Sequence, residues 1–231
     1  MADIYWIGDS TVQFNSILTY PQTGMGQVLN LYLDPSVRVY NHAKNGRSTK
    51  SFMEQGRFEP VKASIKEGDF LFISFAHNDE KETDPERFTT PFGTYKEFLR
   101  VYINTAREKK AYPVLITPIE RRCFEEDGKL GPGKHGEYVR ALREVAEELN
   151  VPVIDLYTKS RELLNKLGPV EAAKLHLVVP AGMYPHFPEG KNDLTHLCYE
   201  GAVTYCGIIA EGLRALGGIY ESLLIDPEKE T

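Results

Sequence analysis

The sequence predicts an α/β fold in which helices cover both faces of a parallel sheet, a three-layer α/β/α sandwich. Three observations lead to this prediction. Five short apolar runs recur along the chain, and helical-looking segments lie between them. Several runs are apolar at nearly every position, as expected of strands covered on both faces. With 231 residues, of which 42% are hydrophobic and 11% aromatic, the chain can bury such a core.

Each apolar run is predicted to form one strand, so the sheet has five strands. Parallel neighbours need long crossover connections, which are right-handed. The carboxyl ends of the strands then meet at one edge, where open α/β sheets bind ligands, and we expect the functional residues there. The predicted strands cover residues 4–8, 37–40, 70–76, 113–119 and 151–157.

Three segments are predicted to form covering helices. In 94–110 and 135–150, apolar residues recur at helical spacing with charged residues on the opposite face. The segment 199–217 is apolar over much of its surface, so we expect it to pack against the sheet. No internal repeat or linker is visible, and we expect a single domain over residues 1–231 with a short frayed tail at about 226–231.

Composition argues against several classes of protein. A formal net charge of -6 disfavours nucleic acid as a partner, because proteins that bind it usually carry a basic stripe. The chain has no apolar run that could span a bilayer and no signal-like start, so we expect a cytoplasmic protein without a membrane partner. Cys123, Cys198 and Cys206 lack metal-type spacing and are expected to be free thiols.

The first chemical signal is Gly8-Asp9-Ser10, which follows the first predicted strand. Ser10 is therefore expected at the carboxyl edge of the sheet, and Gly8 permits a tight turn there. A serine in this position can act as a nucleophile if a base takes its proton. The alternative is structural, because Asp9 and Ser10 are both favoured residues at the N-cap of a helix.

His196 is the histidine best placed in the sequence to be that base. Asp193 lies three residues before it, and a carboxylate at that distance on a turn can accept the imidazole Nδ1 proton and leave Nε2 facing outward. The alternative is that His196 only enters the following helix while Asp193 caps it. The other histidines show no recognised ligand spacing, so we expect no metal site.

Acyl transfer also needs hydrogen-bond donors for the negative charge that develops on the carbonyl oxygen. Two candidates follow the second and third strands. Gly46 in "KNGRS" lets a backbone N–H approach a ligand closely, and Asn78 in "HND" offers a side-chain amide. Taken singly, these motifs are also typical of a turn and of a polar strand end. Their common place at strand ends favours the functional interpretation.

The four motifs occur in the order of the SGNH hydrolases, the GDSL-type esterases, and the chain resembles that family from about residue 4 to 214. More narrowly, "GDSTVQ", "NGRSTKSF", "HND", "TPIERRCF" and "DLTHLCYEGA" resemble the rhamnogalacturonan acetylesterases. The resemblance implies a flavodoxin-like sandwich without metal or organic cofactor. It also implies removal of O-acetyl groups from rhamnogalacturonan, so the expected partner is an acetylated acidic oligosaccharide.

The resemblance further implies a role for each residue of the site. Ser10 is the nucleophile, His196 is the base and Asp193 is the residue that orients the base. The oxyanion hole consists of the Ser10 N–H, the Gly46 N–H and the Asn78 side chain.

Two further features bear on the choice of substrate. Ala76 stands where the family usually has glycine, and the added methyl group is expected to narrow the cleft or shift Asn78. Guanidinium groups bind carboxylates through two parallel hydrogen bonds, so Arg47 or Arg122 is predicted to face the acidic substrate, with His77 nearby. The structural alternatives are that the arginines only brace loops through an ion pair and that His77 lies on the surface or supports the site without contacting the substrate.

Two other functions stay open at this point. An SGNH hydrolase acting on longer acyl esters or thioesters would need an apolar groove, for which Phe14, Tyr20 and Phe75 are candidates. The second is a carbohydrate-binding module without catalysis. The presence of a serine, a histidine and an aspartate in the family order speaks against the module.

Overall fold

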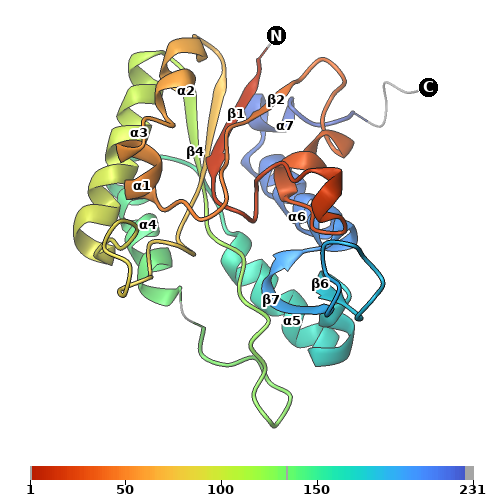
Figure 1. Cartoon of the computed structure of the whole chain (residues 1–231). Helices are drawn as coiled ribbons and strands as arrows, with labels where there is room; N and C mark the ends of the chain where they lie inside the picture. The colour runs from red at the N-terminus through yellow and green to blue at the C-terminus, as the bar shows by residue number, and fades with distance from the viewer. Residues whose placement is uncertain (1, 134, 227–231) are drawn as a thin grey trace.

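A computed structural model describes residues 2–133 and 135–226, and a five-stranded sheet lies at its centre (Figure 1). The strands are β1 (Ile4–Gly8), β2 (Val39–Asn41), β3 (Phe70–Ser74), β4 (Tyr112–Ile116) and β5 (Val153–Ile154). Their order is β2-β1-β3-β4-β5, the flavodoxin-like order, and every pairing is parallel. The predicted α/β/α sandwich is therefore confirmed.

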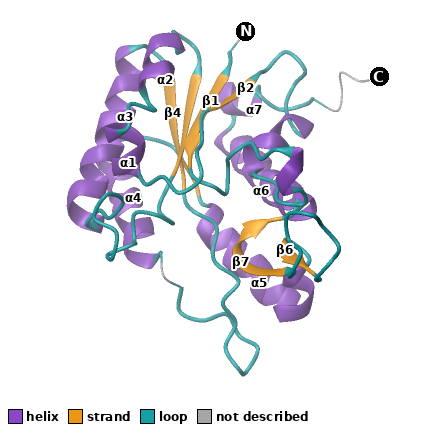
Figure 2. Ribbon diagram, in the orientation of Figure 1, coloured by secondary structure: helices purple, strands orange, loops and turns teal. Residues whose placement is uncertain are grey.

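Helices cover both faces of this sheet (Figure 1, Figure 2). The first layer contains α1 (Thr49–Glu54), α2 (Glu59–Ser64), α3 (Lys96–Glu108) and α4 (Gly136–Leu149). The second contains α5 (Leu156–Ala173), α6 (Tyr199–Leu216) and α7 (Gly218–Glu221). Short helical turns are η1 (Ile17–Thr19), η2 (Met25–Gln27), η3 (Leu29–Leu31) and η4 (Pro91–Tyr95). The helices predicted at 94–110, 135–150 and 199–217 correspond to α3, α4 and α6 and are confirmed.

The central strands are buried on both faces because their side chains alternate between two apolar clusters. In β1, Ile4 and Trp6 belong to the cluster on the α6 side. Tyr5 and Ile7 belong to the cluster on the α3 side. The Trp6 ring meets Phe72 of β3 edge to face, with ring centroids 5.9 Å apart. This two-sided burial explains why the runs are apolar throughout and do not alternate with polar residues.

The fifth predicted strand, 151–157, is shorter than expected, and a helix that the sequence pattern did not predict follows it. The strand ends because the Asp155 side chain accepts a hydrogen bond from the Thr158 N–H (3.2 Å) and caps α5. Gly168, with φ of 68°, and Pro169 interrupt the helical pattern of α5. That interruption conceals α5 in the sequence.

An antiparallel hairpin, also not predicted, lies at the carboxyl edge of the sheet and is made of β6 (His176–Val179) and β7 (Lys191–Leu197) (Figure 1). Asp193 and His196 lie in β7, so their predicted place on a turn is wrong. The reason is pairing with β6, which no local pattern announces. Residue 198, and not Asp193, is the N-cap of α6, so the interpretation of Asp193 as a helix cap is also wrong.

Two remaining expectations concern the cysteines and the chain end. All three cysteines are free thiols, as predicted. Within residues 2–133 and 135–226, no helix is long and apolar enough to cross a membrane. The tail expected to fray begins at Asp226, and its remaining residues, 227–231, lie outside the described residues.

A substitution at Gly201 tests how closely the hairpin packs against α6. A methyl group at Gly201 would lie 1.8 Å from the backbone oxygen of Leu175, which directly precedes β6. We predict that Gly201→Ala lowers the free energy of unfolding by about 3 kcal/mol, because the helix or the hairpin must move. Urea unfolding followed by circular dichroism measures this loss.

Gly136→Ala is the matched control for that variant. Gly136 begins α4, and no atom lies within 4 Å of a methyl group added there. Its unfolding midpoint should stay the same or rise, since alanine is the better helix former. Equal losses in the two variants would contradict the explanation.

Candidate active site

Ser10 is the second residue after β1, at the carboxyl edge of the sheet. Asp9 closes the turn that carries it, because its buried carboxylate accepts hydrogen bonds from the Thr11 N–H (2.9 Å) and hydroxyl (2.8 Å). Residues 10–12 form a turn and no helix follows directly, so the interpretation of Asp9 or Ser10 as a helix cap is wrong. The Ser10 hydroxyl is left to contact another side chain.

That side chain is His196. Its Nε2 lies 2.9 Å from Ser10 Oγ, and its Nδ1 lies 2.9 Å from Asp193 Oδ2. The second carboxylate oxygen, Asp193 Oδ1, accepts the backbone N–H groups of Thr195 and His196, each at 2.8 Å. The structure thus joins Ser10, His196 and Asp193 in one hydrogen-bonded row, although 186 residues separate the serine from the histidine.

Hydrogen bonding keeps the Asp193 carboxylate ionised. Burial by itself raises the pKa of Asp193, but hydrogen bonds from the His196 ring and from two backbone N–H groups outweigh burial and hold this pKa well below its usual range. An ionised carboxylate beside Nδ1 keeps the proton of a neutral imidazole on that nitrogen. The lone pair of Nε2 then faces the Ser10 hydroxyl, so that Nε2 can accept the hydroxyl proton.

Gly46 and Asn78 follow β2 and β3, the strands on either side of β1. The Lys44 N–H donates to the Gly8 carbonyl oxygen (3.0 Å) and holds the Gly46 turn against the end of β1. Gly46 has φ of +73°, a conformation that favours glycine. Neither the Gly46 N–H nor the Ser10 N–H has a hydrogen-bond partner among the residues that the structure describes.

Asn78 is held at both ends of its amide. Its Nδ2 donates to the Arg47 carbonyl oxygen (3.1 Å), and its Oδ1 accepts from Arg87 Nη1 (3.2 Å). One Nδ2 hydrogen remains available within the described part of the chain. With two backbone N–H groups, it can stabilise negative charge beside Ser10. Arg87 was missed because nothing in "ETDPERF" marks an arginine that folds back onto the end of the third strand.

Comparison with known proteins identifies the family. Residues 6–178 match the GDSL-like lipase/acylhydrolase family. The chain belongs to this family. Two curated relatives from Bacillus subtilis span nearly all of the chain. The rhamnogalacturonan acetylesterase RhgT is 40% identical over 216 residues, which is 93% of this chain and 90% of the relative. A probable rhamnogalacturonan acetylesterase, YesY, is 38% identical over 214 residues, 93% of each chain.

Solved structures agree in fold. The Bacillus subtilis protein YxiM superposes with a TM-score of 0.79 at 26% sequence identity, covering 94% of this chain and 57% of its own. An acetylxylan esterase from Geobacillus stearothermophilus superposes with a TM-score of 0.62 at 19% identity, covering 95% of each chain. The second likeness concerns the fold alone.

Arg47 and Arg122, two of the predicted substrate-binding residues, lie in different environments. Arg47 is half-buried; its Nε donates to Gln55 Oε1 and its Nη1 to the Asn45 carbonyl oxygen, each at 2.9 Å. Arg122 is only 9% exposed, and its Nη2 donates to Asn192 Oδ1 (2.6 Å) in β7. This contact agrees with the structural alternative, in which Arg122 braces a loop. Arg47 is only partly buried, and its backbone carbonyl oxygen accepts the Asn78 hydrogen bond (3.1 Å).

His77 and Ala76 are both buried at the end of β3. The His77 ring is 4% exposed and meets the His135 ring edge to face, with centroids 4.3 Å apart. Burial, followed by the charges of His135 and Arg121, holds the pKa of His77 well below its usual range, so its ring is neutral. A role of His77 toward substrate stays a prediction. Ala76 is completely buried in the apolar cluster on the α3 side, so the expectation that its methyl group narrows the cleft is wrong. The alternative, that the methyl group shifts Asn78, stays a prediction.

Arg121 joins two sides of the site, a role that sequence patterns did not indicate. Its Nη1 donates to Thr195 Oγ1 (2.7 Å) in β7. Its Nη2 donates to Glu80 (2.7 Å) and to the His77 carbonyl oxygen (3.4 Å). Burial acts to raise the pKa of Glu80, but its hydrogen bonds to His135 and Arg121 hold that pKa below its usual range. The segment after β3 is thereby tied to the strand that carries the histidine.

Asp79, the residue after Asn78, is completely buried. It accepts hydrogen bonds from the Thr49 N–H (3.1 Å), the Thr49 hydroxyl (2.5 Å) and the Thr89 hydroxyl (3.0 Å). These bonds attach the start of α1 to the end of β3. Burial outweighs them and raises the pKa of Asp79 to about 7.

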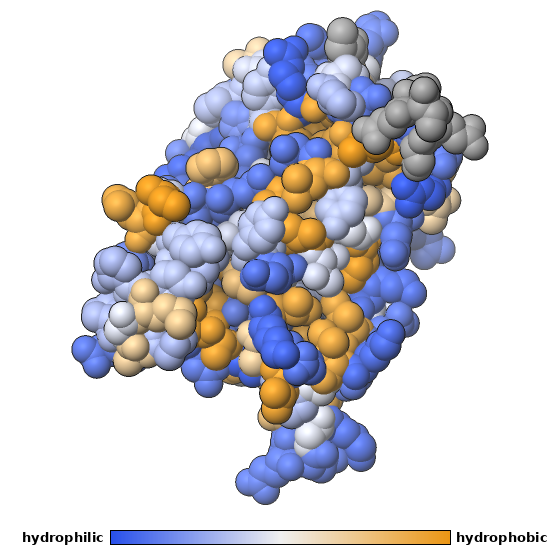
Figure 3. Space-filling view, turned by 90° about the vertical axis from the view of Figure 1, so that its right-hand side faces the viewer, coloured by the Kyte–Doolittle hydropathy of each residue, from blue (hydrophilic) through white to orange (hydrophobic). Residues whose placement is uncertain are grey.

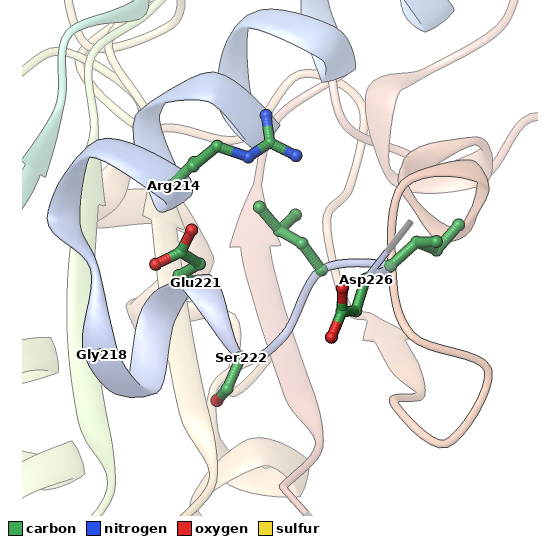
Figure 4. Close-up of a pocket in the computed structure, with 7 residues that line it drawn as sticks. Arg214, Gly218, Glu221, Ser222 and Asp226 are labelled. Atoms are coloured by element: carbon green, nitrogen blue, oxygen red, sulfur yellow. The ribbon is translucent and has the colours of Figure 1, made fainter. Parts of the chain in front are cut away.

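A separate hollow lies at the opposite edge of the sheet and is lined by residues of α6, α7 and the segment after them (Figure 4). Figure 4 shows Arg214 and Glu221 on its helical side and Asp226 on the segment that follows. Tyr220 of α7 contacts Phe70, the first residue of β3, with ring centroids 5.7 Å apart. The hollow therefore lies at the amino edge of the sheet and takes no part in the site around Ser10.

We predict that Arg121→Met lowers kcat for para-nitrophenyl acetate about ten-fold or more while KM changes less. The reason is that β7 loses its support next to His196, which affects proton transfer more than binding. Thr195→Val removes the same hydrogen bond from its other end. In the double variant the two losses are expected to overlap, with a coupling of about 0.5–3 kcal/mol in a double-mutant cycle. Strictly additive losses would contradict the role of this bond.

The raised pKa of Asp79 predicts a pH-dependent stability. A carboxyl group whose folded pKa exceeds its unfolded pKa stabilises the fold below the unfolded value, and this contribution is lost as pH rises through the folded value, about 7. From about pH 5 to about pH 8, the free energy of unfolding should fall by roughly 2–3 kcal/mol more in the wild type than in Asp79→Asn. Urea unfolding across this range measures the difference, and parallel profiles would refute it.

Proposed function

We propose that this chain is a serine esterase that removes O-acetyl groups from oligosaccharides derived from rhamnogalacturonan. The observation that carries the proposal is the 2.9 Å contact between Ser10 Oγ and His196 Nε2. It occurs in a chain that is 40% identical to a rhamnogalacturonan acetylesterase over 93% of its length. A hydroxyl in a row with an imidazole and a carboxylate is the arrangement that acyl transfer requires.

In the proposed first step, Ser10 Oγ attacks the carbonyl carbon of the acetyl ester. His196 Nε2 accepts the hydroxyl proton as the Oγ–C bond forms, and the ionised Asp193 stabilises the resulting imidazolium. The tetrahedral intermediate collapses when the bond to the sugar oxygen breaks. His196 returns the proton to that oxygen, which leaves a free sugar hydroxyl and an acetyl group on Ser10.

In the second step, water replaces the sugar. His196 Nε2 takes a proton from water, the hydroxide attacks the acetyl carbon, and acetate leaves as Ser10 Oγ recovers a proton. In both steps we assign the oxyanion to the Ser10 N–H, the Gly46 N–H and the Asn78 Nδ2. Preorganised donors of this kind contribute about 3–4 kcal/mol each to lowering the barrier in comparable enzymes.

The alternative substrate, a long acyl ester, would need an apolar groove. Of the side chains considered for it, Phe75 is 1% exposed and packs against Phe52 and Tyr102 in the core. Phe14 is exposed, and Tyr20 lines a hollow beside Tyr184, with ring centroids 5.6 Å apart; the face that Figure 3 presents mixes apolar side chains with polar ones. An acetyl group needs no apolar groove, and the two acetylesterase relatives at 40% and 38% identity favour the acetyl ester. A non-catalytic binding module would have no use for the hydrogen-bonded row.

Three features of the proposal rest on the sequence. We propose that residues 1–231 form one SGNH hydrolase domain, that Arg47 lies toward the substrate, and that the substrate is acidic as well as acetylated. Arg47 is partly exposed and its backbone carbonyl oxygen accepts a hydrogen bond from Asn78, which supports its part. The cytoplasmic location and the absence of a nucleic-acid partner stay predictions.

Acetate release tests the proposal. Ser10→Ala is expected to lower kcat on acetylated rhamnogalacturonan oligosaccharides about a thousand-fold or more, because nothing else in the row can form the acyl intermediate. Ser222→Ala, a serine of the α7 side, should behave as wild type. Acetylated xylan and an octanoate ester are assayed in parallel. If only the octanoate ester is hydrolysed, the assignment to a carbohydrate substrate is wrong. If Ser10→Ala still turns over substrate, the proposed serine mechanism is wrong.

A further inference from the structure

Three arginines gather on the Asn78 side of the candidate active site. The carbonyl oxygen of Arg47 accepts one Asn78 amide hydrogen (3.1 Å), and Arg87 Nη1 donates to the oxygen of the same amide (3.2 Å). Arg57 lies beside Arg47, because both donate from Nε to Gln55 Oε1, at 3.3 and 2.9 Å. We refer to Arg47, Arg57 and Arg87 as the arginine cluster.

The charge of the arginine cluster is only partly balanced. Across residues 2–133 and 135–226, Asp84 is the one carboxylate that pairs with any of its members, and it pairs with Arg87. Arg47 and Arg57 share the neutral Gln55 oxygen. Burial, together with the charges of Arg57 and Arg87, lowers the pKa of Arg47. This local excess of positive charge occurs in a chain with a net charge of -6.

The cluster also has unused hydrogen-bond donors. Arg47 engages Nε and Nη1, and Arg57 engages only Nε. Arg47 Nη2 and both terminal nitrogens of Arg57 have no partner in the part of the chain that the structure describes. The three side chains are partly exposed, so a ligand can reach them. Arg122, by contrast, is nearly buried, and its Nη2 donates to Asn192 in β7.

The cluster adjoins the atoms assigned to the oxyanion hole. Besides its bond to Asn78, Arg87 Nη1 lies 3.7 Å from the position that a Cβ atom on Gly46 would occupy. A group bound by the cluster is therefore a near neighbour of the ester that Ser10 attacks. A planar guanidinium matches a carboxylate through paired N–H donors, and rhamnogalacturonan carries a carboxylate on each galacturonate unit.

On the basis of the proposed function, we propose that Arg47 and Arg57, with Arg87 behind them, form a subsite for a galacturonate carboxylate of the acetylated oligosaccharide. Arg57 is the member to test, because its contacts do not involve Asn78. Arg87 adds positive charge to the cluster and also holds the Asn78 amide, so a substitution of Arg87 would change substrate binding and the oxyanion hole together. The subsite makes the enzyme select acidic over neutral acetylated oligosaccharides.

The experiment compares two substrates, an acetylated rhamnogalacturonan oligosaccharide and the same oligosaccharide with its carboxylates reduced to alcohols. The quantity measured is the ratio of their kcat/KM values. We expect a wild-type ratio of about ten or more, a fall of about five-fold to ten-fold in Arg57→Gln, and an intermediate ratio in Arg57→Lys. Raising the salt concentration should also lower the wild-type ratio, because partly exposed charges are screened.

Arg140→Gln is the matched control. Arg140 is an exposed arginine on α4 that stacks on Phe92, 4.6 Å from the ring centroid, and it should keep the wild-type ratio. A wild-type ratio near one, or the same ratio in Arg57→Gln as in Arg140→Gln, would overturn the subsite while acetate release upholds the proposed function. If wild type releases acetate from neither oligosaccharide, the proposed function fails and the subsite with it.

Discussion

The active-site arrangement depends on one contact, the 2.9 Å hydrogen bond between Ser10 Oγ and His196 Nε2. It joins a turn after the first strand to a hairpin strand 186 residues later, so local structure alone cannot maintain it. The Thr23 N–H donates to the Leu197 carbonyl oxygen (3.0 Å) and holds the segment after Ser10 against the end of β7. Arg121 holds the other side of β7 through its side chain. The histidine therefore reaches the serine only when the sheet, the hairpin and both connections are in place.

Three aspartates around this contact, Asp9 and Asp79 buried and Asp193 half-buried, show how the surroundings set the chemistry of one residue type. Asp193 has enough hydrogen-bond donors to stay ionised despite its partial burial. Asp79 also accepts several hydrogen bonds, yet burial dominates and its pKa rises to about 7. Burial likewise raises the pKa of Asp9, which uses its carboxylate to close the Ser10 turn. Of the three, only Asp193 shares a hydrogen bond with a histidine ring. Its negative charge keeps the ring proton on Nδ1 and leaves Nε2 free to accept the Ser10 proton.

Arginines connect the parts of the site that come from different strands. Arg87 fixes the Asn78 amide after β3, and Arg121 ties the same segment to Thr195 in β7. A guanidinium suits this task because it donates in several directions at once. In the arginine cluster, donors remain after the structural bonds are made, and the proposed subsite would use them.

The sequence determined the five central strands, their apolar character and three of the covering helices. It also determined that Ser10, Gly46 and Asn78 follow strands and that His196 precedes a helix. These are properties of short segments, since apolar periodicity and residue type act over a few positions. Only the tertiary structure decided that His196 and its aspartate lie in a hairpin, that the fifth run gives way to α5, and that Arg87 and Arg121 hold the site. Those features depend on hydrogen bonds between residues far apart in the chain, which form only when the packed sheet brings their segments together.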